Sequence, residues 1–198
     1  MKSASLPLAS VALRSALLLL VLAPGSVRFG RQEAALPPAA QRTVILVRHA
    51  EKSSDDPRDP SLSERGRERA QALAELLARA GVKRLVASEY RRTQETLAPL
   101  AAALGIAIES TPAREFEALA TSLSETPAGA TVVVAGHSNT VPLLAARLGA
   151  ALGDVLDGPQ GPALDEQEYD RMFVLTLPPA GSALAPSVLE LAYGHASP

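Results

Sequence analysis

The stretch TVILVRHAE at residues 43–51 joins a short β-branched run to a group of charged and polar residues. A continuous apolar run of this length predicts a strand that is buried on both faces. Such strands are typical of parallel sheets that are covered by helices on each side. We expect the strand to end at Val47, which places Arg48 and His49 at its carboxyl end.

Further along the chain, strand patterns alternate with helix patterns. We expect strands at residues 84–87, 106–108 and 130–135, and helices from about residues 61–63 to 80, and at 92–104, 114–124 and 140–148. Repeated strand–helix units predict a single α/β domain, a three-layer α/β/α sandwich with a mostly parallel sheet.

The ends of the first two predicted helices carry specific signals. Ser61 and Glu64 are spaced as a capping box at the start of the first helix, and Gly81 is expected to end it. The apolar face of this helix would consist of Ala70, Leu73, Leu76, Leu77 and Ala80. Pro99 is expected to bend or divide the second helix, and Gly105 to close it.

The C-terminal part of the chain has a weaker pattern. Residues 153–168 are rich in Gly, Pro and Asp and are expected to form a loop, whose position makes it a candidate cover for a site. Residues 172–177 and 187–191 look like two antiparallel strands joined across Gly181.

The N-terminal segment differs in composition from the rest. Lys2 and Arg14 precede a short apolar run at residues 15–23, which Pro24-Gly25 interrupts. This pattern is typical of a signal peptide at residues 1–23, or of an uncleaved anchor, followed by a linker at 24–41 and the folded domain at 42–198. Export to the periplasm or the extracellular space would follow, whereas a misassigned start codon would leave the domain in the cytoplasm.

Composition excludes several kinds of protein. The 198 residues are 47% hydrophobic and 20% charged, as in globular proteins, and contain no cysteine, so disulfides, thiolate catalysis and cysteine-based zinc sites are excluded. The three histidines are not at ligand spacing, and we expect no metal.

The predicted domain is acidic. Without residues 1–40, 15 basic and 20 acidic residues remain, a net charge of −5. No basic stripe suggests nucleic acid, and an anionic substrate would need a local positive pocket.

Polar residues follow three of the predicted strands. Arg48 and His49 follow the first, residues 88–92 the second, and Gly136-His137 the strand at 130–135. Ligands of open α/β sheets bind outside the carboxyl ends of the strands. We therefore expect two histidines and two arginines, Arg48 and Arg92, to meet at one edge of the sheet.

Four fragments, in this order and at these spacings, resemble the histidine phosphatase superfamily, the phosphoglycerate mutase-like branch 1. They are VRHAEK from Val47, LSERGRERAQAL from Leu62, SEYRRTQET from Ser88 and GHSNT from Gly136. The resemblance runs from about Thr43 to Leu148, and Ala50 stands where many members have Gly, an RHA-type variant of their RHG motif. It implies a phosphoglycerate mutase-like fold and a phosphatase that needs no metal or other cofactor.

The resemblance also implies roles for individual residues. His49 would attack the phosphoryl group and form a phosphohistidine, which water then hydrolyses. Arg48, Arg92 and His137 would clamp the phosphoryl oxygens, and Ser88 is either a further phosphate ligand or a helix cap. We expect a backbone hydrogen bond to hold one nitrogen of His49, and the guanidinium groups nearby to keep the other unprotonated.

No residue is clearly marked as the proton donor to the leaving group. Many relatives carry a carboxylate between the third strand and the GH motif, where this chain offers Glu115 and Glu117. Relatives with a GHD sequence use an acid after the second histidine, where this chain has Ser138. The donor could also be Glu51, or the leaving group could need none, as in a phosphoramidate that is already protonated.

The expected function is that of an exported phosphatase acting on a small phosphorylated substrate. A phosphohistidine protein phosphatase and a non-catalytic phosphate-binding interaction module stay open as alternatives. A mutase is disfavoured because phosphoglycerate mutases have longer substrate-clamping insertions than this chain can supply. No membrane span is expected apart from the possible N-terminal anchor, and the sequence does not indicate an oligomeric state.

Overall fold

The computed structural model describes residues 41–179 and 181–197. The expected signal peptide or anchor at 1–23, and the expected linker apart from Gln41, lie outside these residues. A six-stranded sheet forms the centre of the described part, in the order β3-β2-β4-β1-β7-β8. Its strands are β1 (Arg42–Arg48), β2 (Val82–Ala87), β3 (Ile108–Ser110), β4 (Thr131–Gly136), β7 (Arg171–Leu177) and β8 (Ser187–Ala192).

The sheet is mostly parallel, as predicted. Strands β3, β2, β4 and β1 run parallel to one another, while β7 is antiparallel to both β1 and β8. The antiparallel pair expected near the C-terminus is therefore confirmed as β7 and β8.

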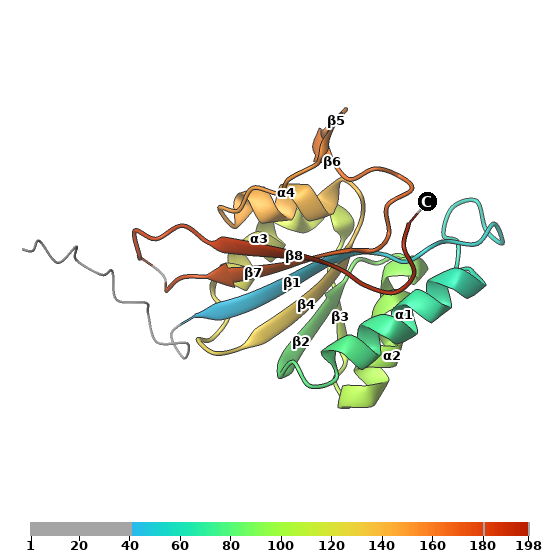
Figure 1. Cartoon of the computed structure of the whole chain (residues 1–198), viewed down its shortest axis with the longest axis horizontal. Helices are drawn as coiled ribbons and strands as arrows, with labels where there is room; N and C mark the ends of the chain where they lie inside the picture. The colour runs from blue at the N-terminus through green and yellow to red at the C-terminus, as the bar shows by residue number, and fades with distance from the viewer. Residues whose placement is uncertain (1–40, 180, 198) are drawn as a thin grey trace, which may run out of the picture. The chain divides into compact units, whose positions relative to one another are not determined.

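Four helices complete the three-layer sandwich. Helices α1 (Glu64–Leu77) and α2 (Arg91–Leu104) pack on one face of the sheet, and α3 (Phe116–Ser124) and α4 (Thr140–Arg147) on the other (Figure 1). No helix within the described residues is both long and apolar enough to cross a lipid bilayer.

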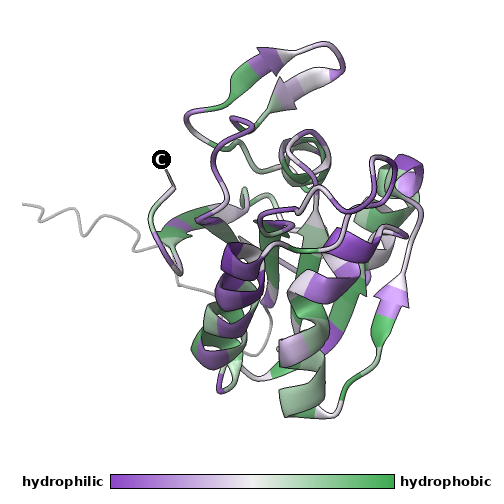
Figure 2. Ribbon diagram, turned by 90° about the vertical axis from the view of Figure 1, so that its right-hand side faces the viewer, coloured by the Kyte–Doolittle hydropathy of each residue, from purple (hydrophilic) through white to green (hydrophobic). Residues whose placement is uncertain are grey.

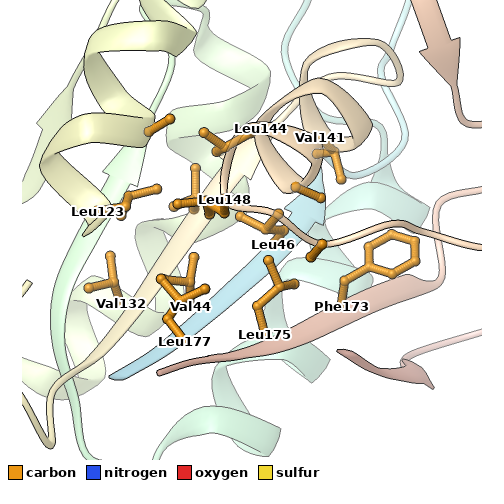
Figure 3. Packing of buried hydrophobic residues seen from close by; sticks show 14 of the residues in the cluster. Val44, Leu46, Leu123, Val132, Val141, Leu144, Leu148, Phe173, Leu175 and Leu177 are labelled. Atoms are coloured by element: carbon orange, nitrogen blue, oxygen red, sulfur yellow. The ribbon is translucent and has the colours of Figure 1, made fainter. Parts of the chain in front are cut away.

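Strand β1 is buried on both faces, which explains its continuous apolar sequence. Val44 and Leu46 pack with residues of α3 and α4, whereas Ile45 and Val47 face α1 and α2. Figure 3 shows the first of these layers, in which Leu46 lies among side chains that include Leu144 of α4. Each such side chain contributes roughly 1.5–3 kcal/mol on burial, so the two cores hold β1 and β4 firmly in place beneath the site.

Helix α1 begins where it was predicted to begin, but its N-cap and its C-terminal end differ from the prediction. Its N-cap is Ser63, whose Oγ accepts a hydrogen bond from the Gly66 N–H at 3.1 Å. The capping box predicted for Ser61 and Glu64 is wrong because the Ser61 hydroxyl donates to Asp55 instead. The helix ends at Leu77, before Ala80, and Leu76 is half exposed, so neither residue belongs to the apolar face.

Smaller differences occur in three other places. Helix α2 runs undivided through Pro99 and ends at Gly105, which has a left-handed conformation with φ of 66°. Strand β3 begins two residues later than predicted, and a 3-10 turn (η2, Ala113–Glu115) precedes α3.

The segment expected to be a loop at 153–168 contains a short hairpin. Its strands are β5 (Leu156–Gly158) and β6 (Gly161–Ala163). The hairpin projects from the rest of the domain at the top of Figures 1 and 2, and Figure 2 shows that the central strands of the large sheet are more apolar.

Candidate active site

The parallel pairing of β1 with β4 brings two histidines together. Arg48 is aligned with Gly136, so His49 and His137 follow matching positions, and the His49 N–H donates to the Gly136 carbonyl at 2.9 Å. The ring centroids of the two histidines are 5.4 Å apart. The structure therefore brings together the histidines that were expected to meet at this edge of the sheet.

Strand β2 and helix α2 add Ser88 and Arg92 to the same place. Ser88 follows Ala87, which is aligned with Ala135, and the Ser88 Oγ lies 2.9 Å from His137 Nε2. Arg92 lies in the first turn of α2, where its Nη2 is 3.5 Å from His137 Nδ1. Ser88 also lies 2.8 Å from the Thr93 hydroxyl, so in this structure it holds His137 and the start of α2 together.

These residues line an open cleft of about 430 Å³. The volume lies within the usual range for small-molecule sites and exceeds what a phosphoryl group alone would need. The basic residues of its lining are Arg48, Lys52, Arg92 and Arg114, and the acidic one is Glu166. The excess of positive charge is the local attraction for anions that an acidic domain requires.

The surroundings of His49 determine which of its nitrogens is free. Its Nδ1 lies 2.8 Å from the Ala50 carbonyl oxygen. Burial lowers the pKa of His49 to about 3, and the charge of Arg48 adds to this effect, while the bond to Ala50 opposes it. The ring is thus neutral at pH 7. Because a carbonyl oxygen can only accept, the proton resides on Nδ1 and Nε2 keeps its lone pair.

His137 is also neutral in this structure. Burial lowers its pKa to about 4, and the neighbouring Arg92 contributes in the same direction. A neutral imidazole can act as either donor or acceptor at each nitrogen, depending on the tautomer. Arg92 in turn stacks on the ring of Tyr90 at 4.3 Å, which limits where its guanidinium can move.

Arg48 is only 2% exposed and is bound by the segment that leads into β7. Its Nη1 donates to the carbonyl oxygens of Asp165 and Glu168 at 2.7 and 3.1 Å, and its Nη2 donates to the Glu166 carboxylate at 2.8 Å. The guanidinium lies over the ring of Tyr169, 4.1 Å from its centroid. Its Nε is buried and has no hydrogen-bond partner among the described residues.

The carboxylates named as proton-donor candidates lie elsewhere. Glu115 is half exposed and does not line the cleft, although its neighbours Arg114 and Phe116 do. Glu117 pairs with Arg147 at 2.6 Å. Glu51 accepts hydrogen bonds from both Nε and Nη2 of Arg69, at 2.9 and 2.7 Å, which ties its carboxylate to α1.

Glu166 was not predicted from the sequence. It belongs to the segment that was expected to be a loop and a candidate cover, and no motif marks it. The described residues contain no group of three or more His, Cys, Asp or Glu that is arranged to hold a metal ion.

Comparison with known proteins agrees with this geometry. Residues 44–117 match the model of the histidine phosphatase superfamily (branch 1). The protein histidine phosphatase SixA complexed with tungstate is 19% identical, with a TM-score of 0.56, and the match covers 76% of this chain and 96% of that one. A mycobacterial glucosyl-3-phosphoglycerate phosphatase is 17% identical, with a TM-score of 0.55, covering 77% of this chain and 100% of that one.

A third similar structure is a protein from Nakamurella multipartitia assigned as a phosphohistidine phosphatase SixA. It is 25% identical, with a TM-score of 0.52, and the match covers 81% of this chain and 99% of that one. The matched segment carries Arg48, His49 and Arg92, and the shared fold supplies the strand end that bears His137. Residues 44–117 thus match the histidine phosphatase superfamily, and the fold of the described residues is that of solved structures described as phosphatases.

Proposed function

We propose that this protein is a phosphatase that hydrolyses a phosphomonoester through a covalent phosphohistidine on His49. The observation that carries the proposal is the hydrogen bond between His49 Nδ1 and the Ala50 carbonyl. It leaves Nε2 as an unprotonated nucleophile in a cleft that contains Arg48 and Arg92.

The charges of the cleft suit the transfer of a phosphoryl dianion. Catalysis of phosphoryl transfer consists mainly of positioning and charge neutralisation. The guanidinium groups of Arg48 and Arg92 and a nitrogen of His137 would bind the oxygens of the phosphoryl group. His49 Nε2 would attack in line with the leaving oxygen, and water would then release phosphate from the phosphohistidine. These residues supply the positive charge themselves, so we propose that the reaction needs no metal.

A small phosphorylated molecule is the substrate class that we favour, because the cleft is of ordinary small-molecule size. A phosphohistidine protein phosphatase is the second candidate. It is supported by the likeness to structures of that description, one of which is 25% identical to this chain. A substrate screen that includes phosphosugars, nucleotides and a phosphohistidine peptide would separate the two, since only the second candidate requires the peptide to be the best substrate.

We also propose that residues 1–23 direct export or anchor the protein, on the basis of the charged and apolar pattern of the sequence. N-terminal sequencing of the mature protein checks this proposal. A mature chain that starts after residue 23 indicates a cleaved signal peptide, and one that starts at Met1 indicates an anchor or a cytoplasmic protein.

The function itself is tested by turnover and by trapping the intermediate. The full chain should release phosphate from p-nitrophenyl phosphate in the presence of EDTA, and should form an acid-labile, base-stable phosphoenzyme. His49→Ala should lower kcat by at least ~10³-fold and abolish the phosphoenzyme.

His195→Ala is the matched control, because His195 is exposed and lies outside the cleft. Full activity in His49→Ala would contradict the proposal. Binding of phosphate without any turnover would instead support the phosphate-binding interaction module.

A further inference from the structure

Glu166 is the acidic residue in the lining of the cleft. Its Oε2 accepts from Arg48 Nη2 at 2.8 Å, and its Oε1 accepts from the Ser138 hydroxyl at 2.6 Å. Arg48 precedes His49 and Ser138 follows His137, so the carboxylate is bound by the two residues that flank the histidine pair. Its side chain is 73% exposed, so it can change position without disturbing the core.

Hydrolysis of an ordinary phosphate ester requires a proton donor, because an alkoxide is a poor leaving group at neutral pH. The other carboxylates considered for this role, Glu51, Glu115 and Glu117, are not in the lining of the cleft. Glu51 is held by Arg69, and Glu117 pairs with Arg147. We propose that Glu166 donates the proton to the leaving oxygen, an inference that rests on the proposed function.

The two steps balance as follows. In the first, His49 Nε2 forms a bond to phosphorus, the bond from phosphorus to the leaving oxygen breaks, and the Glu166 carboxyl proton passes to that oxygen. In the second, water attacks phosphorus, its proton passes to the Glu166 carboxylate, and the phosphorus–nitrogen bond returns its electron pair to Nε2. The products are an alcohol and phosphate, and Glu166 regains its proton.

Substrate binding supplies a physical reason for Glu166 to become protonated. In the free protein, the hydrogen bond from Ser138 and the charge of Arg48 hold the pKa of Glu166 below its usual value, although burial acts in the opposite direction. The charged groups that face it are Arg48 from β1 and Lys52 from the loop after β1, and the neutral but titratable His137 faces it from the residue after β4. A phosphoryl dianion that takes over Arg48 removes one of these stabilising charges and adds negative charge nearby, so both effects raise the pKa of Glu166.

The test compares Glu166→Gln with wild type on substrates that differ in their leaving group. For an alkyl phosphate such as glycerol phosphate, kcat/KM should fall by ~10²-fold or more, the usual contribution of a general acid. For p-nitrophenyl phosphate, whose leaving group needs no proton, kcat/KM should stay within about threefold, because it reports only formation of the phosphoenzyme and not the later attack of water, in which Glu166 accepts a proton. Glu166→Asp, which keeps an acid at this position, should recover part of the alkyl phosphate rate and guards against a folding defect in the first variant.

Glu109→Gln is the matched control, because the Glu109 carboxylate on β3 also binds an arginine, Arg84, at 2.7 Å but lies outside the cleft. It should behave as wild type with both substrates.

An equal loss of kcat/KM on both substrates in Glu166→Gln would overturn the inference in favour of a role in positioning Arg48. A tighter inhibition by inorganic phosphate, with no dependence on the leaving group, would overturn it in favour of a carboxylate that merely competes with substrate. If either result is seen, the proposed phosphatase function still holds as long as wild type turns over substrate and His49→Ala does not. If wild type turns over no substrate, both the proposed function and the role of Glu166 are refuted.

Discussion

Glu51 lies two residues after His49, and Arg69 of α1 binds its carboxylate through two nitrogens. Arg69 is fully buried and also donates to the Tyr193 carbonyl at 2.7 Å, so it links the loop after β1 to the C-terminal segment. Burial raises the pKa of Glu51, but the hydrogen bonds and charge of Arg69 outweigh this effect and keep the pKa below its usual value. Glu51 is thus a structural partner of Arg69, not a free acid.

Replacing Arg69 with Met should lower the free energy of unfolding by about 3–5 kcal/mol, because one half of a buried ion pair is removed. Urea denaturation measures this change. Arg65→Met is the control, since Arg65 contacts the same carboxylate at 3.2 Å from a half-exposed position and should cost about 1 kcal/mol or less. If the two substitutions lower the free energy of unfolding equally, the buried ion pair of Arg69 contributes no more to stability than the exposed contact of Arg65.

Site residues that directly follow a predicted strand could be placed from the sequence, whereas site residues in irregular segments could not. His49 and His137 each follow a strand, so predicting the strands also predicted where these two histidines lie. Glu51 was misjudged because its partner, Arg69, lies on the following helix. Glu166 was missed because it reaches Arg48 from 118 positions further along the chain, through a segment without periodicity.

Helix α1 meets the loop after β1 at Gly66. A Cβ at this position would lie 2.2 Å from the Glu51 carbonyl oxygen, which is part of the backbone and cannot rotate away. Gly66→Ala should therefore cost about 1–3 kcal/mol of stability through overpacking, even though Ala is the better helix former. It should also lower phosphatase activity, because the displaced loop carries His49.

Thermal unfolding and turnover of p-nitrophenyl phosphate measure the two effects of Gly66→Ala. Gly153→Ala is a matched control, because no atom lies within 4 Å of its added Cβ and its φ is not positive. A Gly66→Ala variant as stable and active as this control would show that α1 can move away from the loop without consequence.

Elements buried on both faces were predicted well, and irregular ones were not. Strands β1 and β4 could be recognised because helices cover both faces of the sheet, so that successive side chains are all buried and the sequence is continuously apolar. The β5–β6 hairpin was missed because each strand has three residues and includes Gly, which leaves no alternating pattern to detect. The N-cap of α1 was misassigned, although its start was not, because Ser61 and Ser63 are both suited to the cap and Asp55 binds Ser61.

For the whole molecule, the two buried histidines make stability depend on pH. Their pKa values are lowered from 6.5 to about 3 for His49 and about 4 for His137, so the unfolded chain binds protons below pH 6.5 that the folded protein does not. The free energy of unfolding should therefore fall as the pH drops from 7.5 to 5. Carboxylates such as Glu51 add to the loss only at lower pH, near their usual pKa of 4.5.

Urea denaturation at pH 7.5 and pH 5 checks this expectation. A His49→Gln variant should show a smaller loss between the two values, whereas His195→Ala should lose as much as wild type, because His195 is exposed. Stability that does not change over this range would mean that the histidines titrate alike in the folded and unfolded states.

The alignment of β1 with β4 also has a consequence for the order in which the molecule assembles. Its paired residues, such as Thr43 and Thr131, are 88 positions apart, whereas the helices form from contacts close in sequence. Closing so long a loop is slow compared with helix formation, so the two histidines meet only late in folding. We therefore expect a refolding chain to form helical turns while it still lacks a reactive centre, and to acquire activity only when the central parallel pair closes.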